Sequence, residues 1–445
     1  MQQYKQEWFG NIRGDILAGI VVCLALFPEV IGFMIVAGVP PIVGVYATFF
    51  ITAIAAFFGS SKGMISAAAG SVALVLAHLV AEYGIQYLFA ATILAGILQV
   101  ALGLLKVGTL MRYIPKPVMT GFVNGLGIMM FTSQLDHFQG SLLLPLLGLL
   151  GIAIIFLFPR ITKKIPAPIV AILVITGIVL GFGLDVKTLG DMGSISTDLP
   201  RFGIPAVPMK LETLRIIFPT ALSVAIVGLV ESLLTAQLVD EITDEKSDKN
   251  QETLSQGLGN VVSGFFGGIA GCGMIGQTII NLNYGGLGRL ATFLSGFFML
   301  LSVVLLNGSV VQIPVVALAA VMVVVSIETI NWDSIKLLRT NPKNESFAMI
   351  LTVAIVIGTH NLAYGVVAGT LVSAVFAAFK MSHLHVATGT ADDDHHYKVD
   401  GHLYFASAEK FLDFFAEEIE QEEEIFIDIS AMTLWDSTAV EAIDK

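Results

Sequence analysis

Glu231 is a carboxylate inside a long apolar segment, residues 214–238, and Thr235 follows it one helical turn later. Ionisable side chains in such segments are costly to bury and are usually functional. Residues four apart share one face of a helix, so the two side chains are expected to lie together. Burial favours the neutral form of a carboxyl group, so Glu231 could carry a proton, or it could bind Na⁺. The alternative is a structural carboxyl group that caps or bonds a neighbouring helix.

Two stretches rich in small residues could also do chemistry: GFFGGIAGCGMIGQTIIN at 264–281 and SSKGMISAAAGSVALV at 60–75. Glycine costs a helix about 1 kcal/mol relative to alanine. We therefore expect irregular backbone that leads into a short half-helix, beginning near Gly273 in the stretch 264–281. The alternative is that the small residues only allow neighbouring helices to pack closely.

Two half-helix starts that face one another would form an anion site, because each presents free N–H groups and a partial positive charge. The backbone groups expected to hold the anion belong to Ala69, Gly70 and Ser71 at one start and to Gly273, Met274 and Ile275 at the other. The hydroxyl of Ser71 could add a further donor. Gln277 lies one turn further in and could bond the substrate or the other half-helix.

The composition describes the surroundings of these residues. Hydrophobic residues make up 55% of the chain and charged residues 13%, whereas a soluble domain is nearer 25% charged. A polytopic membrane protein is therefore expected. The net charge of −12 lies largely in the C-terminal tail, and the chain has no basic stripe for nucleic acid. No nucleophile–base spacing or phosphate loop appears, so we expect neither an enzyme nor a cofactor other than a coupling ion, H⁺ or Na⁺.

Apolar runs of spanning or half-spanning length number about fourteen, and the short ones are those rich in glycine. They lie near 16–37, 41–58, 64–81, 86–105, 114–135, 141–158, 167–183, 214–238, 253–268, 272–283, 289–307, 312–328, 346–359 and 361–380. Fourteen spans divide into two halves of seven, and the interrupted span is the third in each half. An odd number of spans inverts the second half relative to the first, which is the inverted-repeat plan of secondary transporters.

The charges of the connecting loops predict the orientation. Alternate loops carry the basic residues Lys62, Lys106, Arg112, Lys116, Arg160, Lys163, Lys164, Lys246, Lys249, Arg289, Lys336, Arg339 and Lys343. The short loops on the other side, such as 136–141 and 359–362, have neither Lys nor Arg. Positive loops stay in the cytoplasm, so both termini are expected there, in a plasma or bacterial inner membrane.

The composition changes after Lys380, and residues 382–445 are polar and acidic. Their pattern predicts a strand at 403–406, an amphipathic helix at 408–420 and a buried strand at 425–429. We therefore expect two domains: a transmembrane domain at 1–381 and part of a cytoplasmic α/β domain at 382–445.

Several segments, in this order, resemble the SulP family of anion permeases. They are GDILAGIVVCLALFPEVIGFMIVAGVPPIVGVYA at 14–47, IPKPVMTGFVNGLGIMMFTSQL at 114–135, GLGNVVSGFFGGIAGCGMIGQTIIN at 257–281, IPVVALAAVMVVVSIETINWDSI at 313–335 and HNLAYGVVAGTLVS at 360–373. The tail resembles the start of a STAS domain, with IDISAMTLWDSTAVEAI at 427–443 as its core strand, loop and following helix.

The resemblance implies a core of spans 1–4 and 8–11 that carries the site. It implies a gate of spans 5–7 and 12–14, against which the core moves as an elevator, and it implies a homodimer. The family usually has an acidic residue at the position of Glu231, and its sodium-coupled bicarbonate members have Asp there, with Thr one turn on. Those members also carry Thr near the positions of Ala69 and Ile275, which this chain lacks.

Two further residues have open assignments. By resemblance Glu29, in LFPEVIGF, faces the substrate cavity where many members have Gln; it could line the site or contact a neighbouring helix. Ser437 lies in Asp436-Ser437-Thr438, which resembles a loop phosphorylated in related regulators; the alternative is a turn and helix N-cap.

We therefore expect a secondary active transporter of small anions: sulfate first, then bicarbonate or a dicarboxylate, in symport with H⁺ or Na⁺ and embedded in membrane lipid. One alternative is a nucleobase symporter, which would need polar base-reading side chains where this chain has Ala, Gly, Met and Ile. Others are an anion-responsive sensor or scaffold that acts through the STAS domain, and a passive anion channel.

Overall fold

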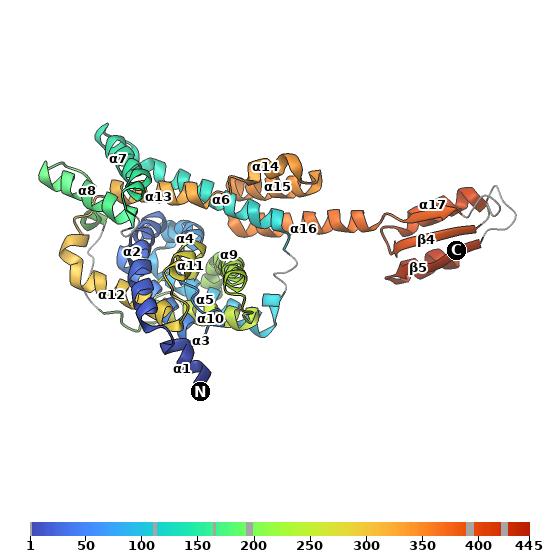
Figure 1. Ribbon diagram of the computed structural model, residues 1–445, viewed down its shortest axis with the longest axis horizontal. Coiled ribbons are helices and arrows are strands. Elements are labelled where there is room, and N and C mark those ends of the chain that lie inside the picture. The colour runs from blue at the N-terminus through green and yellow to red at the C-terminus, as the bar shows by residue number, and fades with distance from the viewer. Residues whose placement is uncertain (1, 110–113, 163–165, 193–198, 389–395, 420–425) are drawn as a thin grey trace.

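A computed structural model gives the fold, and it describes residues 2–109, 114–162, 166–192, 199–388, 396–419 and 426–445. Arg112, Lys163 and Lys164 lie outside these residues. The chain is an all-α polytopic membrane domain followed by a small α/β domain (Figure 1).

Fourteen of the described helices coincide with the apolar runs of the sequence. The first seven are α2 (Ile12–Ala37), α3 (Pro41–Phe58), α4 (Gly70–Tyr83), α5 (Ile85–Leu104), α6 (Lys116–Gln134), α7 (Leu143–Leu157) and α8 (Ala167–Gly181). The second seven are α9 (Leu211–Thr243), α10 (Lys249–Phe265), α11 (Ile275–Asn283), α12 (Arg289–Val310), α13 (Val315–Thr329), α15 (Lys343–Thr359) and α16 (Leu362–Met381). Helices α1 (Gln2–Phe9) and α14 (Ser334–Thr340) are short additions.

Length and hydropathy alone identify fewer spans. Among the described helices, six are long and apolar enough to cross a membrane unaided, or seven if the bent pair of α13 and α14 counts as one. The half-helices α4 and α11 have 14 and 9 residues, too few to cross a hydrocarbon core of about 30 Å. Each follows a three-residue strand, where the sequence predicted irregular backbone in the third span of each half.

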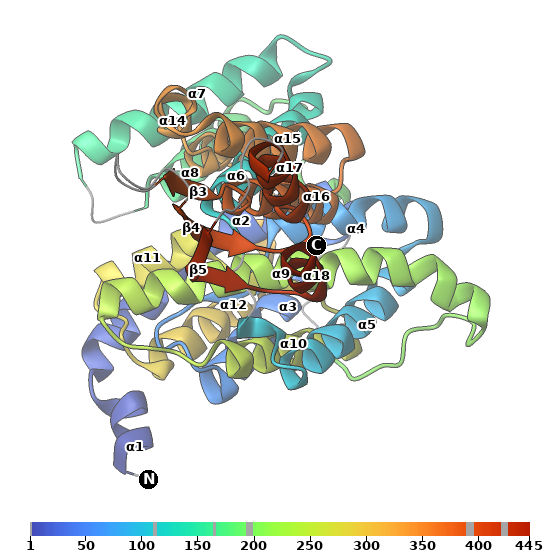
Figure 2. The ribbon, with the colours of Figure 1, turned by 90° about the vertical axis from the view of Figure 1, so that its right-hand side faces the viewer.

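The fourteen helices pack as two groups. One group contains α2–α5 and α9–α12, with extensive contacts of α10 with α5 and of α12 with α2 and α3. The other contains α6–α8, α13, α15 and α16, in which α6 packs on α13, α15 and α16. Figures 1 and 2 show the second group as a layer above the first. Helix α13 against α2 and α16 against α9 form the principal contacts between the groups.

The two interrupted spans pair with one another at the centre of the first group. Strand β1 (Ser66–Ala68) runs antiparallel to β2 (Gly271–Gly273), with Ala67 opposite Cys272. A Cβ atom at Gly271 would lie 2.1 Å from the carbonyl oxygen of Ala67, so this pairing requires glycine there. The pairing places the starts of α4 and α11 next to each other.

The C-terminal domain lies at the far end of α16 (Figure 1). Strand β3 (His385–Thr388) pairs antiparallel with β4 (His396–Leu403), which pairs parallel with β5 (Phe426–Leu434). Helix α17 (Ala408–Ile419) connects β4 to β5, and α18 (Ser437–Asp444) ends the chain.

The strands of this domain differ from those that the sequence predicts. The expected strand at 403–406 is a turn after Leu403, and β4 occupies the preceding polar stretch. The alternation of apolar and polar residues in β4 explains this difference. Tyr397 and Val399 point into the core of the domain, beside Phe411 and Phe415 of α17, and polar residues alternate with them. Strand β5 extends to Leu434, beyond the expected end at 429, and none of its residues is buried, although the sequence predicted a buried strand.

Candidate functional site

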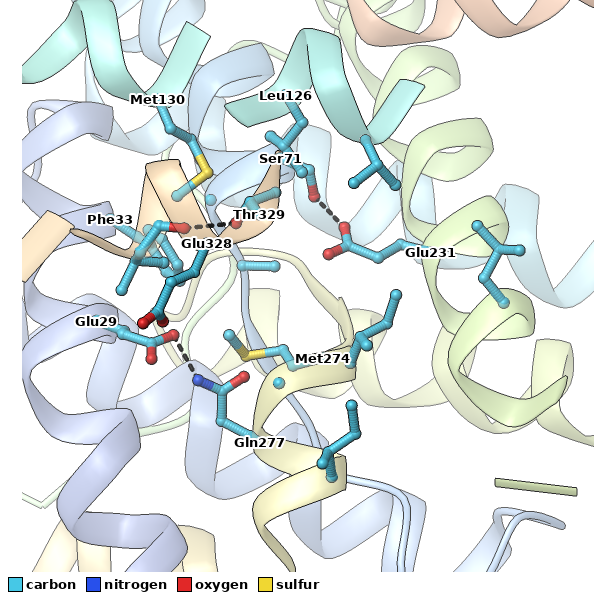
Figure 3. Close-up of a pocket in the computed structure, with 18 of the residues that line it drawn as sticks. Glu29, Phe33, Ser71, Leu126, Met130, Glu231, Met274, Gln277, Glu328 and Thr329 are labelled. Carbon is cyan, nitrogen blue, oxygen red and sulfur yellow. Dashed lines mark hydrogen bonds between the residues drawn. The ribbon is translucent and has the colours of Figure 1, made fainter. Parts of the chain in front are cut away.

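A cavity of about 360 Å³ lies where the two helix groups meet. Its lining residues come from α2, α4, α6, α9, α11 and α13, together with the caps of α4 and α11. The residues expected from the sequence that line it are Glu29, Ala69, Gly70, Ser71, Glu231, Met274, Ile275 and Gln277. The structure thus brings together expected residues from two continuous apolar segments, α2 and α9, and from both interrupted spans (Figure 3).

The starts of both half-helices face this cavity. The first bond within α4 runs from Ala73 N–H to the carbonyl of Ala69, so Gly70, Ser71 and Val72 have no acceptor within the helix. In α11 the corresponding bond runs from Thr278 N–H to the carbonyl of Met274. Ile275, Gly276 and Gln277 are therefore the orphan donors of that helix. Two sets of N–H groups therefore face one cavity, and helix N-termini of this kind attract anions through their free donors and the helix dipole.

Gly273 differs from the expectation. It belongs to β2 rather than to the half-helix, and α11 begins at Ile275 with Met274 as its N-cap. The N–H of Gly273 donates to Ser232 Oγ at 2.9 Å, and Gly273 does not line the cavity. The pairing of β2 with β1 holds this residue in extended backbone, which moves the helix start two residues onward.

Glu231 enters the cavity from α9. Its Oε2 accepts from Ser71 Oγ at 2.5 Å and from Cys272 Sγ at 3.1 Å, so one oxygen contacts both interrupted spans. Thr235 is fully buried, and its hydroxyl donates to the backbone carbonyl of Glu231 at 2.8 Å instead of lining the cavity. The carboxylate therefore contacts one half-helix and the strand that precedes the other, whereas the structure does not bring the Thr235 hydroxyl to it.

A second carboxylate, Glu29 of α2, lies across the cavity. Gln277 Nε2 donates to Glu29 Oε2 at 2.5 Å, so Gln277 contacts another helix of its own group. Glu328 of α13 points toward Glu29 in Figure 3. Sequence reasoning missed Glu328; an acidic side chain at the end of an apolar run, in SIETIN, was the available signal.

The opposite wall is apolar. Phe122, Val123, Leu126 and Met130 of α6 line it, and Phe33 of α2 lies beside Gly70. Among the described residues that line the cavity, three are acidic and none is Lys, Arg or His. An anion bound in this cavity would therefore depend on backbone and side-chain hydrogen-bond donors, without a cationic side chain to offset the carboxylates.

Polar side chains support the irregular backbone behind the site. Asn260 Oδ1 accepts from Gly271 N–H at 2.9 Å, and its Nδ2 donates to the Gly271 carbonyl at 3.2 Å. Gln256 Nε2 donates to the same carbonyl at 2.9 Å. Thr278 Oγ1 accepts from Ile65 N–H at 3.0 Å. Backbone at membrane depth needs such partners, and sequence reasoning missed them although α10 carries amide side chains unusual for an apolar span.

Ser437 lies far from this cavity, in the C-terminal domain. It is exposed and is the first residue of α18, while Asp436 is the N-cap whose carboxylate accepts from Ala439 N–H. The arrangement matches the turn and N-cap alternative, and it leaves the Ser437 hydroxyl accessible.

Comparison with known proteins identifies the class. The model of the sulfate permease family matches residues 12–143 and 140–352, and that of the STAS domain matches residues 386–445. The chain therefore belongs to the sulfate permease family, as the resemblance in its sequence predicted. The fold of two helix groups around paired interrupted spans is an anion-transporter fold.

Individual proteins of known name are also similar to this chain. YbaR of Bacillus subtilis (strain 168), which carries a provisional name as a sulfate transporter, is 50% identical over 99% of this chain and 92% of its own length. The bicarbonate transporter BicA of Picosynechococcus sp. is 28% identical over 86% of this chain and 73% of its own. The murine Solute Carrier 26 family member A9 anion transporter, solved in an inward-facing state, has the same fold, with a TM-score of 0.83 at 17% identity over 100% of this chain and 84% of that one.

Proposed function

We propose that this protein carries small oxyanions across the membrane in symport with a cation bound at Glu231. The observation that carries the proposal is the contact of Glu231 Oε2 with Ser71, at the start of one half-helix, inside the cavity that both half-helices face. An anion at the half-helix starts and a proton or Na⁺ at Glu231 would stabilise each other, because each offsets the charge of the other.

Sulfate is the first proposed substrate, and bicarbonate and dicarboxylates follow. The name of YbaR supports sulfate, and the name of BicA supports bicarbonate as the alternative. Sulfate is a compact tetrahedral acceptor, which suits a site whose donors are N–H groups and one hydroxyl. The proposed reaction is transport without covalent chemistry.

We further propose that the group α2–α5 and α9–α12 moves as an elevator against the other group. Helix contacts within each group are more extensive than those between them, which supports two rigid bodies. A Cβ atom at Gly32 of α2 would lie 2.5 Å from the Met322 side chain of α13, so cysteines at these two positions can test the motion. A disulfide there should stop transport until it is reduced; full activity of the cross-linked protein would contradict the elevator.

The orientation and assembly are also proposals. Arg289 binds Glu7 at 2.8 Å and Lys62 binds Glu245 at 2.7 Å, which gathers the charged helix ends beside the N-terminal helix. Charge of this kind supports cytoplasmic termini in a plasma or inner membrane. A homodimer is proposed from the family, and the mass of the protein in lipid nanodiscs will test it.

Uptake of radiolabelled sulfate and bicarbonate into proteoliposomes tests the main proposal. Imposed H⁺ or Na⁺ gradients should drive uptake by the unmodified protein. Glu231→Gln should abolish the dependence on the gradient, because the amide can bind neither ion as a carboxylate does. Glu441→Gln, an exposed change in α18, is the matched control and should leave uptake unchanged. Gradient-driven uptake that persists in Glu231→Gln would contradict the coupling role of Glu231.

A further inference from the structure

Ser71 Oγ and Cys272 Sγ both donate to the same oxygen, Glu231 Oε2, and the two donors are 3.8 Å apart. Ser71 lies in the first turn of α4 and lines the cavity, whereas Cys272 is the middle residue of β2 and is fully buried. Only the Ser71 hydroxyl is therefore next to both the carboxylate and the space where an anion would lie.

A serine hydroxyl has one hydrogen to donate. We propose that this hydrogen is the coupling element of the site: charged Glu231 holds it, and a proton or cation on Glu231 releases it to the anion. The proposal rests on the proposed function, and it adds the group that links the binding of the anion to the binding of the proton or cation at Glu231.

The change requires only one proton. When Glu231 Oε2 takes a proton from solution, it becomes an O–H donor, and Ser71 Oγ can accept that hydrogen with a lone pair. The Ser71 hydrogen can then turn toward the cavity and join the N–H groups of Gly70 and Ser71 on the anion. No other bond is made or broken. A cation on Oε2 would have the same effect, because it would displace the hydroxyl from that oxygen.

Cys272 is a positioning residue in this scheme. A thiol is a weak donor, so it does not replace the serine bond, and its burial keeps it away from the anion. It holds the carboxylate against β2 while the serine turns. A stronger donor at this position would compete with Ser71 for Oε2 and leave the serine free more often.

The neighbouring charges do not supply an alternative switch of this kind. The elements packed on α9 contribute Ser71 from α4, the Cys272 thiol from β2, Gln277 from α11, and the neutral amides Gln99 from α5 and Asn260 from α10. Lys249 of α10 is charged, but it pairs with Asp240 at 2.7 Å, nine residues beyond Glu231 on α9. Asn361, the N-cap of α16, donates to Ser223 of α9 and is neutral as well. The titratable groups across the cavity are Glu29 and Glu328, and among the described residues neither carboxylate forms a hydrogen bond with Ser71.

Sulfate binding to the purified full chain in nanodiscs, measured by calorimetry, tests the proposal. The comparison is between about pH 5.5 and about pH 8, a range in which a buried carboxyl group can titrate. The unmodified protein should bind sulfate more tightly at the acid end. Ser71→Ala should weaken binding by about tenfold at acid pH but by less than about twofold at alkaline pH, where the hydrogen is already engaged by Glu231.

Cys272→Ser gives a test in the opposite direction. The introduced hydroxyl should donate to Glu231 Oε2 in place of Ser71, which frees the Ser71 hydrogen for the anion. Sulfate binding should therefore tighten by about threefold at alkaline pH and change little at acid pH. A merely structural role of either residue would not produce this gain. The variant Cys23→Ala, at the other buried cysteine, should leave the pH profile of binding unchanged.

The outcomes are distinct. If Ser71→Ala lowers affinity equally at both pH values, or Cys272→Ser leaves the alkaline affinity unchanged, the coupling role of Ser71 is overturned. If Ser71→Ala does not fold, Cys272→Ser alone decides. If the unmodified protein neither binds nor transports sulfate, bicarbonate or a dicarboxylate at any pH, the proposed function fails first.

Discussion

Asn260 and Gly271 bond each other in both directions: the glycine N–H donates to Asn260 Oδ1 at 2.9 Å, and Asn260 Nδ2 donates to the glycine carbonyl at 3.2 Å. The Asn260 side chain thus supplies the two hydrogen bonds that a neighbouring strand would supply to Gly271 of β2. It explains how extended backbone persists at the centre of a membrane domain, where water does not supply partners.

Replacement of this asparagine should destabilise the domain. Asn260→Leu leaves the N–H of Gly271 unpaired in a buried site, at a cost of about 1 to 3 kcal/mol. Thermal unfolding in detergent, followed through tryptophan fluorescence, should show a clear fall in Tm and a loss of transport. Asn344→Leu, at an exposed position of α15, is the control. Equal unfolding temperatures for the two variants would show that the two bonds contribute nothing.

The same strand gives a steric prediction. Gly271→Ala places a methyl group 2.1 Å from the carbonyl oxygen of Ala67, so β1 and β2 cannot keep their pairing. We expect little folded protein in the membrane. Gly358→Ala in α15 is the matched control, because its methyl group meets no atom within 4 Å. That change should stabilise the helix by about 0.5 to 1 kcal/mol. Expression and gel filtration distinguish the two, and normal yield of Gly271→Ala would contradict the role of the β1–β2 pairing.

The carboxylates across the cavity should weaken anion binding. Glu29→Gln keeps an oxygen that can accept from Gln277 but removes a negative charge, and Glu328→Gln removes the charge at the α13 side. Each should lower the KM for sulfate at neutral pH by about threefold to tenfold, because a nearby like charge disfavours the anion. Glu441→Gln should change nothing. An unchanged KM in both cavity variants would show that these groups are already neutral during transport.

Low pH should lower the local stability of the segment between α8 and α9. Thr188 donates its N–H and its hydroxyl to Asp191 Oδ2, both at 2.8 Å, and these bonds hold the pKa of Asp191 below its ordinary value. A lowered pKa in the folded state means that the stabilisation is present above the ordinary aspartate value and is lost as the pH falls through the lowered one.

Hydrogen exchange measures this effect at the N–H of Leu189, which donates to the carbonyl of Ile313. Its protection, corrected for the intrinsic rate, should fall between about pH 4 and about pH 2, the region below the ordinary aspartate pKa of about 3.9. In Asp191→Asn the protection should be lower throughout and independent of pH. A pH-dependent loss of protection that persists in Asp191→Asn would assign the effect to another group.

Much of this architecture follows from the sequence alone. Apolar runs must form helices in lipid because every backbone polar group needs an internal partner. The glycines at 264–281 and the small residues at 60–75 therefore predict interrupted spans, and the structure places a strand and a half-helix in each. The cost of burying a carboxylate singled out Glu231, and the structure places it at the cavity.

Other features depend on contacts between distant segments, which local patterns do not encode. Glu328 meets the cavity only because α13 packs on α2, and Cys272 reaches Glu231 only because β2 pairs with β1 beside α9. The same pairing draws Gly273 into a strand and leaves the donors of α11 two residues later than its glycines indicate. The sequence determined which residues had to break the helices and which charge was costly to bury. The tertiary structure decided which N–H groups, thiol and hydroxyl meet that charge, because those contacts join residues as far apart in the chain as Ser71 and Cys272.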